Sequence, residues 1–244
     1  MKLVAPLAAT VFAVLLWQAI VTLTGLPKFI LPGPVLVAET WWQNRSVIAE
    51  HTLVTLSEVL IGLGIGTALG FVTALHLSTS QMARVFVQPL LVFTQALPVF
   101  ALAPILTLWL GYGLWSKVAM AVLIIYFPVT SSFLDGLLRT PGGYLDLART
   151  MQARPARVLW LIRVPAALPS LASGLRLAAV YAPIGAVIGE WVGASQGLGY
   201  LMLLANGRAK TDLMFAALLT LGVLSVALYL IVGVAARKLA DRAG

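Results

Sequence analysis

This sequence contains no cysteine and few charged residues. The 244 residues contain no cysteine, which excludes disulfide bonds, thiol catalysis and cysteine-ligated zinc. Only 10% of the residues are charged, compared with about 25% in soluble proteins. The two histidines, His51 and His76, lie at opposite ends of one apolar stretch, so no metal site or acid–base cluster is expected. Nothing in these residues points to an enzyme.

Most of the sequence consists of apolar residues. Hydrophobic residues make up 61% of the chain, and the mean hydropathy is +1.00. Six stretches are long enough to cross a bilayer, which predicts an all-α membrane protein with about six transmembrane helices. They cover residues 3–24, 52–77, 85–110, 117–134, 171–192 and 213–236. The first could be a signal peptide, but no small-x-small cleavage site closes it, so we interpret it as an uncleaved helix.

The segment after the first span is rich in proline and ends in aromatic residues. Val35, Ala38, Trp41 and Trp42 oppose Glu39 at helical spacing, which is typical of a helix lying along the membrane surface. A plain loop is the alternative. We therefore divide the chain into an outer unit, 1–50, with the first span and this interfacial segment, and a core domain, 51–244.

Two spans carry glycine at every fourth position. The glycines are Gly62, Gly66 and Gly70 in one span, and Gly185, Gly189 and Gly193 in another. This spacing predicts helices whose backbones approach a neighbour closely. The first set includes a Gly-x-Gly, but no third glycine or Lys-Ser/Thr follows at nucleotide-binding spacing, so ATP is not expected to bind here.

Polar residues and prolines inside the predicted spans are candidates for lining a solute route through the membrane. Residues 85–110 lack charge but contain Gln95, Pro98 and Pro104, so we expect a broken helix covered by protein or water. Simple kinked packing is the alternative. Glu58, Glu190 and the adjacent Trp191 are further candidates, because a membrane carboxylate is a functional-site hypothesis by default. Glu58 could instead reach water at the interface, whereas Glu190 should pair with another polar group.

The most basic window, Arg149 to Arg163, lies between two apolar halves. Ionised side chains cost roughly 3 kcal/mol or more each at the bilayer centre, so this segment belongs in water. One short helix is expected after Thr140-Pro141 and should end before Pro155; a second run, 156–164, should stop at Pro165.

The first of these helices has an ordered apolar face. Tyr144, Leu147, Ala148 and Met151 share that face, which favours a docking surface. An ordinary loop held in the cytoplasm by its charge is the alternative.

Charge also predicts orientation. The net charge of +8 would suggest nucleic acid in a soluble protein, but here the basic residues gather in one loop and near the C-terminus. With both termini in the cytoplasm, the inner side holds eleven of the 16 Lys and Arg residues, including Lys2 and Arg242. The positive-inside rule selects this topology, and nucleic acid is not an expected partner.

The basic window also resembles a known pattern. Asp146-Leu147-Ala148, then Gln152, then Ile162-Arg163-Val164-Pro165 match the loop of bacterial ABC importer permeases: Glu-Ala-Ala, three residues, Gly, nine residues, Ile-x-Leu-Pro. Asp replaces Glu, Leu replaces the first Ala, Val replaces Leu, and Gln152 stands at the glycine. Because that glycine marks a turn in the family, we expect the bend to move to Ala153-Arg154-Pro155.

The resemblance extends over nearly the whole chain. Segments 31–34, 97–113, 168–176 and 197–199 are similar to the nitrate, taurine and alkanesulfonate permeases. Segments 184–193, 200–202 and 211–217 are more similar to the branch that imports the hydroxymethylpyrimidine precursor of thiamine. Glu58 and Glu190 are the ionisable residues deep in the outer half, which mildly favours a neutral or amine-bearing substrate over an anion.

The resemblance implies a type I ABC importer permease fold, with a coupling-helix loop at 139–170. It implies a homodimer in the bacterial inner membrane, a separate ATPase that binds ATP-Mg, and a periplasmic binding protein. This chain itself would hold no cofactor, metal or catalytic residue. The residues expected to couple to the ATPase are Asp146, Ala148, Arg149, Thr150, Met151, Ala153 and Pro165.

Two other classes remain open at this stage. A secondary transporter would usually have more spans, internal repeats and buried ion ligands, and no repeat is obvious here. A membrane-embedded enzyme would need a nucleophile, a metal or an acid–base set in the membrane.

Overall fold

The computed structural model describes residues 4–241, so Lys2 and Arg242 of the charge count lie outside it. Every regular element in this part of the chain is a helix, as predicted. The elements are α1 (Val4–Thr24), α2 (Pro34–Gln43), α3 (Arg45–Thr79), α4 (Gln81–Ala96), α5 (Val99–Leu110), α6 (Leu114–Leu138), α7 (Gly142–Thr150), α8 (Pro155–Val158), a π-helical turn η1 (Leu159–Arg163), α9 (Val164–Gly193), α10 (Leu198–Gly207) and α11 (Thr211–Asp241).

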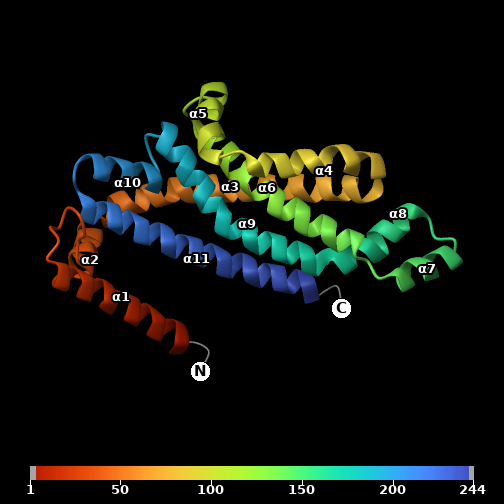
Figure 1. The fold of residues 1–244 in the computed structure, drawn as a ribbon, viewed down its shortest axis with the longest axis horizontal. Helices are drawn as coiled ribbons and strands as arrows, with labels where there is room; N and C mark the ends of the chain where they lie inside the picture. Colours follow the sequence, from red (N-terminus) through yellow and green to blue (C-terminus); the bar gives the residue numbers. More distant parts are fainter. Residues whose placement is uncertain (1–3, 242–244) are drawn as a thin grey trace.

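The molecule is elongated, with α7 and α8 at one end and α2 and α10 at the other (Figure 1). Four helices are long and apolar enough to cross a membrane: α3, α6, α9 with its α8 extension, and α11. The pair α4 and α5 would make a fifth span, bent by 101°. The remaining predicted span, residues 3–24 at the start of the sequence, corresponds to α1.

Helix α6 is the centre of the packing, held between α3 and α9 by the two glycine series. A Cβ added at Gly62 would lie 2.6 Å from the Cβ of Ala121, and one at Gly66 would meet Ile125. From the other side, a Cβ at Gly185 would lie 2.7 Å from the Cα of Ala121. Backbones this close exclude any side chain larger than glycine, which explains the periodic glycines.

The remaining glycines of the two series make similar contacts. Gly70 lies against Val129, Gly189 against Lys117, and Gly193 against Thr107 and Tyr112. Next to Gly70, the stacked rings of Phe71 on α3 and Phe133 on α6 lie between the two helices, with centroids 4.8 Å apart.

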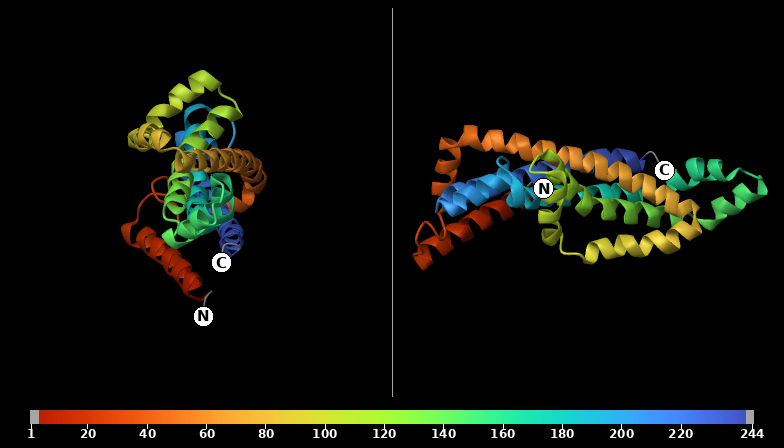
Figure 2. Two further views of the ribbon diagram at one scale, coloured as in Figure 1. Left: turned by 90° about the vertical axis from the view of Figure 1, so that its right-hand side faces the viewer. Right: turned by 90° about the horizontal axis from the view of Figure 1, so that it is seen from above.

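The third apolar stretch is broken, as its prolines predicted. α4 ends at Ala96, and Leu97 and Pro98 adopt extended conformations (ψ 130° and 113°) before α5 begins at Val99. Proline at 98 has no N–H and disfavours helical geometry in Leu97, so the helix stops there. α5 then turns sharply away from α4 (Figure 2).

The prediction that the second loop helix stops at Pro165 is wrong. α8, η1 and α9 form one continuous helix from Pro155 to Gly193. Pro165 occupies the first turn of α9, and the π-helical turn just before it widens the helix, with Val164 N–H bonded to the Leu159 carbonyl. A wider turn gives room for the proline ring, which would otherwise clash with a carbonyl four residues earlier.

Two further expectations change. Residues 193–210 are rich in glycine, a composition that predicts an outer or re-entrant loop, but they contain the helix α10. The boundary drawn at residues 50 and 51 falls inside α3, which runs through it without interruption.

The α2 segment is a helix, as its pattern suggested, and α11 holds it in place. Thr40 donates a hydrogen bond to Asp212 (2.8 Å), and the Trp41 indole donates one to Thr220 (3.0 Å). α1 is attached more lightly, through the stacked rings of Trp17 and Phe215 at 5.8 Å.

Candidate functional site

The turn after α7 lies at Gln152, the position of the family glycine. Gln152 has a left-handed backbone (φ 51°), while Arg154 is extended before Pro155. The Ala153 N–H bonds to the Ala148 carbonyl, and the Gln152 N–H to the Arg149 carbonyl. This is the Schellman arrangement that normally places glycine at the left-handed residue. The expected shift of the bend to residues 153–155 is therefore wrong: glutamine adopts the glycine conformation.

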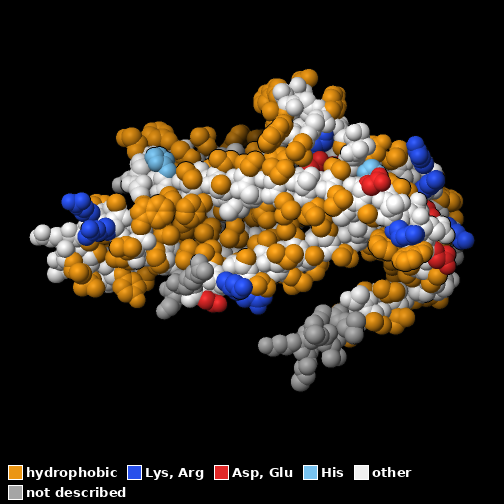
Figure 3. Space-filling view, turned by 180° about the vertical axis from the view of Figure 1, so that it is seen from behind, with side chains coloured by type: hydrophobic (Ala, Val, Ile, Leu, Met, Phe, Trp, Pro, Cys, Tyr) orange, Lys and Arg blue, Asp and Glu red, His pale blue; other side chains and the backbone are white. Residues whose placement is uncertain are grey.

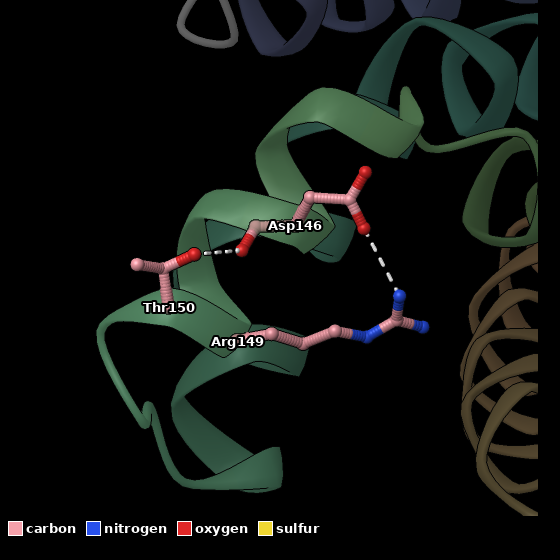
Figure 4. Close-up of polar contacts among 3 residues, drawn as sticks. All are labelled: Asp146, Arg149 and Thr150. Atoms are coloured by element: carbon pink, nitrogen blue, oxygen red, sulfur yellow. Dashed lines mark hydrogen bonds and ion pairs between the residues drawn. The ribbon is translucent and has the colours of Figure 1, made fainter.

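Three of the predicted coupling residues interact within α7 (Figure 4). The Arg149 guanidinium lies 3.0 Å from the Asp146 carboxylate, and both side chains extend to the same side of the helix. The Thr150 hydroxyl, on the other side, donates to the Asp146 carbonyl at 3.0 Å. The ion pair is 71–80% exposed, so it adds at most about 1 kcal/mol to folding. Its groups remain free to contact another molecule.

The apolar side of α7 faces a hollow rather than a core. A cavity of about 560 Å³ lies between α7 and the α8–η1 segment. Tyr144, Leu147 and Met151 line it and are 58%, 59% and 72% exposed. Ala148 is buried beneath them and Ala153 lines the same hollow. Large apolar side chains held open at the tip of the molecule are typical of a protein-binding site.

Arg154 and Arg157 also line the hollow, and basic side chains are visible beside this tip in Figure 3. The tip therefore combines an apolar hollow with a positive rim. Pro165 does not line the hollow; it sits in the first turn of α9, where the hollow's wall joins the transmembrane helix.

The predicted route residues separate into two groups. Gln95 and Pro98 flank the α4–α5 break and are exposed. Just beyond the break, the Phe100 ring lies 6.1 Å from the ring of Trp191 on α9, which is 43% exposed. None of these four side chains is charged: one is an amide and two are aromatic rings.

Glu190 belongs to the second group, which is buried at the α10 end. Its side chain is 1% exposed. One carboxylate oxygen accepts a hydrogen bond from Thr55 (2.6 Å), and the other accepts from the N–H groups of Gly199 and Tyr200. The expected polar partners are therefore found within this chain, in α3 and in the first turn of α10.

The start of α10 is held by side chains from two other helices. The Leu198 N–H donates to Thr55 (2.8 Å), and the Gly197 N–H donates to Nδ1 of His51 (3.0 Å). With the two bonds to Glu190, the backbone donors from 197 to 200 are satisfied, which isolated helix N-termini leave open. A Cβ at Gly197 or Gly199 would collide with the Glu190 carboxylate, so glycine is required at both positions.

Lys117 and Glu58 complete this buried group. The Lys117 ammonium donates to the carbonyls of Gly113 (2.9 Å) and Gly193 (2.8 Å), and also to that of Tyr112. It thereby joins the end of α9 to the turn between α5 and α6. Glu58 is 3% exposed, so it does not reach water as one alternative suggested, and its Oε2 has no hydrogen-bond partner among the described residues.

Sequence reasoning did not identify several of these residues. Lys117 was counted only as a flanking charge, and Thr55 and His51 were given no role. The signal that could have found them is the buried Glu190 followed by Gly197-Leu-Gly199, since a carboxylate near two glycines suits backbone N–H donors.

Comparison with known proteins assigns the family. Residues 66–243 match the family model described as "Binding-protein-dependent transport system inner membrane component". The chain belongs to this family. A probable ABC transporter permease protein of Haemophilus influenzae is 50% identical over 228 residues, 93% of each chain.

Two other relatives carry more specific names. The formylaminopyrimidine transport permease protein ThiX of Halalkalibacterium halodurans is 41% identical, over 76% of this chain and 74% of that one. The riboflavin transport system permease protein RibX of Chloroflexus aurantiacus is 37% identical, over 91% and 84%. Relatives named for aliphatic sulfonates and taurine are 26% and 27% identical.

The fold is also found in solved structures. A chain of the MetNI methionine ABC transporter, in an inward-facing conformation, aligns with a TM-score of 0.60 at 19% identity, covering 85% of this chain and 98% of that one. This ABC importer permease is thus an all-α, multi-pass protein of the inner membrane. It is not an enzyme, because ATP hydrolysis in such systems takes place on separate subunits.

Proposed function

We propose that the permease imports a neutral nitrogen heterocycle, with a thiamine pyrimidine precursor such as hydroxymethylpyrimidine as the best candidate, and that α7 couples it to the ATPase. In this proposal two copies pair, a periplasmic binding protein delivers the solute, and both termini lie in the cytoplasm. The ATPase subunits hold ATP-Mg and receive α7 in a surface groove.

The exposed apolar hollow at the tip supports the coupling role. Nothing within residues 4–241 covers Met151, Leu147 and Tyr144, and the Schellman turn fixes the end of the helix that carries them. A rigid apolar patch with charged residues at its rim matches the composition of an interface centre. Asp146, Arg149 and Thr150 would then supply polar contacts around it.

Binding to the cognate ATPase tests this role directly. Met151→Asp should weaken binding by about 2 kcal/mol, roughly 30-fold, because it places a charge at the centre of the apolar contact. Met151→Leu keeps the apolar contact and should bind normally. Since Met151 is 72% exposed, neither change should shift the unfolding midpoint much. Equal binding by both variants would refute the assignment.

The uncharged surface at the α4–α5 break supports the choice of solute. Residues 85–110 contain no Lys or Arg to bind a sulfonate, whereas Gln95 offers amide hydrogen bonds and Phe100 and Trp191 offer aromatic faces. Planar heterocycles stack on aromatic rings and bond to amides. ThiX and RibX, both named for nitrogen heterocycles, are more similar to this chain than the relatives named for sulfonates.

Uptake into vesicles tests the solute. The permease, its ATPase and its binding protein, reconstituted together, should take up labelled hydroxymethylpyrimidine or formylaminopyrimidine only with ATP. Uptake of taurine in preference to both, or uptake driven by a proton gradient without ATP, would overturn the proposal. Trp191→Ala should slow pyrimidine uptake, whereas Trp42→Ala, which removes another exposed indole, should not.

A further inference from the structure

A small basic pocket lies between α9 and α11, away from the sites above. It encloses about 170 Å³ and is lined by Arg176, Tyr229, Leu230, Gly233 and Arg237. The chain brings together one arginine from within a transmembrane helix and one from the last turns of another. Neither belongs to the coupling surface, to the α4–α5 break or to the Glu190 group.

Among the described residues, 4–241, the two arginines of this pocket have no carboxylate partner. The Nε atom of Arg176 is shielded from solvent and makes no hydrogen bond within residues 4–241. Arg237 donates through Nε to the Gly233 carbonyl, at 3.2 Å. Within those residues the one ion pair is Asp146–Arg149, so neither arginine has a carboxylate within 4.0 Å. Two adjacent guanidinium groups repel each other unless an anion lies between them.

The surroundings of the pocket indicate what kind of anion it is. Along α11, Val226, Leu230 and Val234 follow one another on the same side and are 59%, 55% and 47% exposed. They form an apolar stripe that leads to Arg237. In Figure 3, basic side chains lie at the C-terminal end of α11 with an acidic side chain beside them, on a surface that is otherwise largely apolar or neutral. An apolar stripe ending at paired arginines fits an acyl chain attached to a phosphate.

We propose that this pocket binds the phosphate of an anionic phospholipid from the inner leaflet, with an acyl chain along α11. The choice of leaflet rests on the proposed function, which places the α7 end of the molecule in the cytoplasm. Basic pockets between helices on the cytoplasmic side are known to bind acidic lipid headgroups. In this proposal Nε of Arg176, which has no acceptor within residues 4–241, donates a hydrogen bond to the phosphate, and Arg237 lines the other side of the pocket.

Lipid binding to the full-length chain, delipidated in non-ionic detergent, tests the proposal. Native mass spectrometry should show one tightly held phosphatidylglycerol per chain and no comparable retention of phosphatidylcholine. Arg176→Gln and Arg237→Gln should each weaken phosphatidylglycerol binding on the order of tenfold, as expected for loss of a charge-assisted hydrogen-bonding group. Arg237 is exposed, so its variant remains informative if Arg176→Gln does not fold.

Lys238→Gln is the matched control. It removes a positive charge from the same end of α11, but Lys238 does not line the pocket. Unchanged binding by this variant supports a built site, whereas an equal loss in all three variants would reduce the effect to general attraction and overturn the proposal. Stabilisation by inorganic phosphate alone, to the same extent as by phosphatidylglycerol, would identify a free anion and also overturn it. These outcomes do not depend on ATPase binding or solute uptake, so they are separate from tests of the proposed function.

Discussion

The buried carboxylate of Glu190 shows how a single side chain organises one end of this permease. A carboxylate shielded from water is stable in a protein only when its oxygens accept hydrogen bonds. Here the donors come from Thr55 on α3 and from the backbone of α10, so the residue ties together three helices. This arrangement explains the fixed course of residues 193–199 without reference to a substrate.

Glu190→Gln should therefore destabilise the protein by about 1–3 kcal/mol, because one amide oxygen cannot replace two acceptor oxygens and the NH₂ group would face backbone donors. The unfolding midpoint in detergent measures this effect, with Glu39→Gln at an exposed position as control. A variant as stable as the parent chain but defective in uptake would contradict the structural role and return Glu190 to the solute route.

A substitution at Gln152 should instead increase stability. A left-handed backbone costs a residue with a side chain roughly 1–2 kcal/mol relative to glycine. Gln152→Gly should therefore stabilise the turn after α7 by about 1 kcal/mol, which corresponds to roughly fivefold slower opening. Hydrogen exchange at the Ala153 amide, which bonds across this turn, measures the change. Faster exchange in the variant would show that the turn is not strained at this residue.

At the scale of helix pairs, two glycines can be compared: one packs against a neighbouring helix and the other does not. Gly185 lies against the backbone of Ala121, whereas Gly64 has no atom within 4 Å of an added Cβ. Gly185→Ala should destabilise the protein by about 1–3 kcal/mol through overpacking against a backbone that cannot move aside. Gly64→Ala should instead stabilise α3 by up to about 1 kcal/mol, since alanine is the better helix former. Thermal unfolding of the pair distinguishes these signs, and equal shifts would contradict the α6–α9 contact.

The helices themselves were largely predictable, because their signals are local. Long apolar runs gave the spans, Pro98 gave the break, and the glycine periods marked helices able to approach a neighbour closely. The errors arose where tertiary packing overrides a local signal. Pro165 would end an ordinary helix, but the π-helical turn before it accommodates the ring. α10 was missed because its first turn depends on Thr55, His51 and Glu190, which are distant in sequence.

The candidate site also has a part that local sequence predicts and a part that depends on tertiary contacts. The loop pattern located α7, and its exposed apolar face followed from helical spacing. The partners of Glu190 and Lys117, and the pairing of Phe100 with Trp191, require knowledge of which helices meet. Sequence spacing along one helix cannot provide that knowledge.

For the whole molecule, orientation is the property most open to direct measurement. The natural chain has no cysteine, so single cysteines can be introduced without a background. Met151→Cys, at the α7 tip, and Asn206→Cys, in α10, both place the thiol at an exposed position. A membrane-impermeant thiol reagent added outside intact cells should label Asn206→Cys only, and Met151→Cys should react after the membrane is opened. The reverse pattern would contradict the proposed topology.

The uninterrupted helix from Pro155 to Gly193 has a mechanical consequence. At 1.5 Å per residue its 39 residues make a rod about 58 Å long, which begins beside the α7 hollow and ends at the residues that hold α10. Pro169 and Pro183 lie inside α9 and each removes one backbone hydrogen-bond donor, yet the helix continues through both. The least regular part is the widened turn, Leu159–Arg163, close to the hollow. In the proposed coupling mechanism, a displacement of α7 by the ATPase would therefore reach the α10 end as a tilt of this long helix.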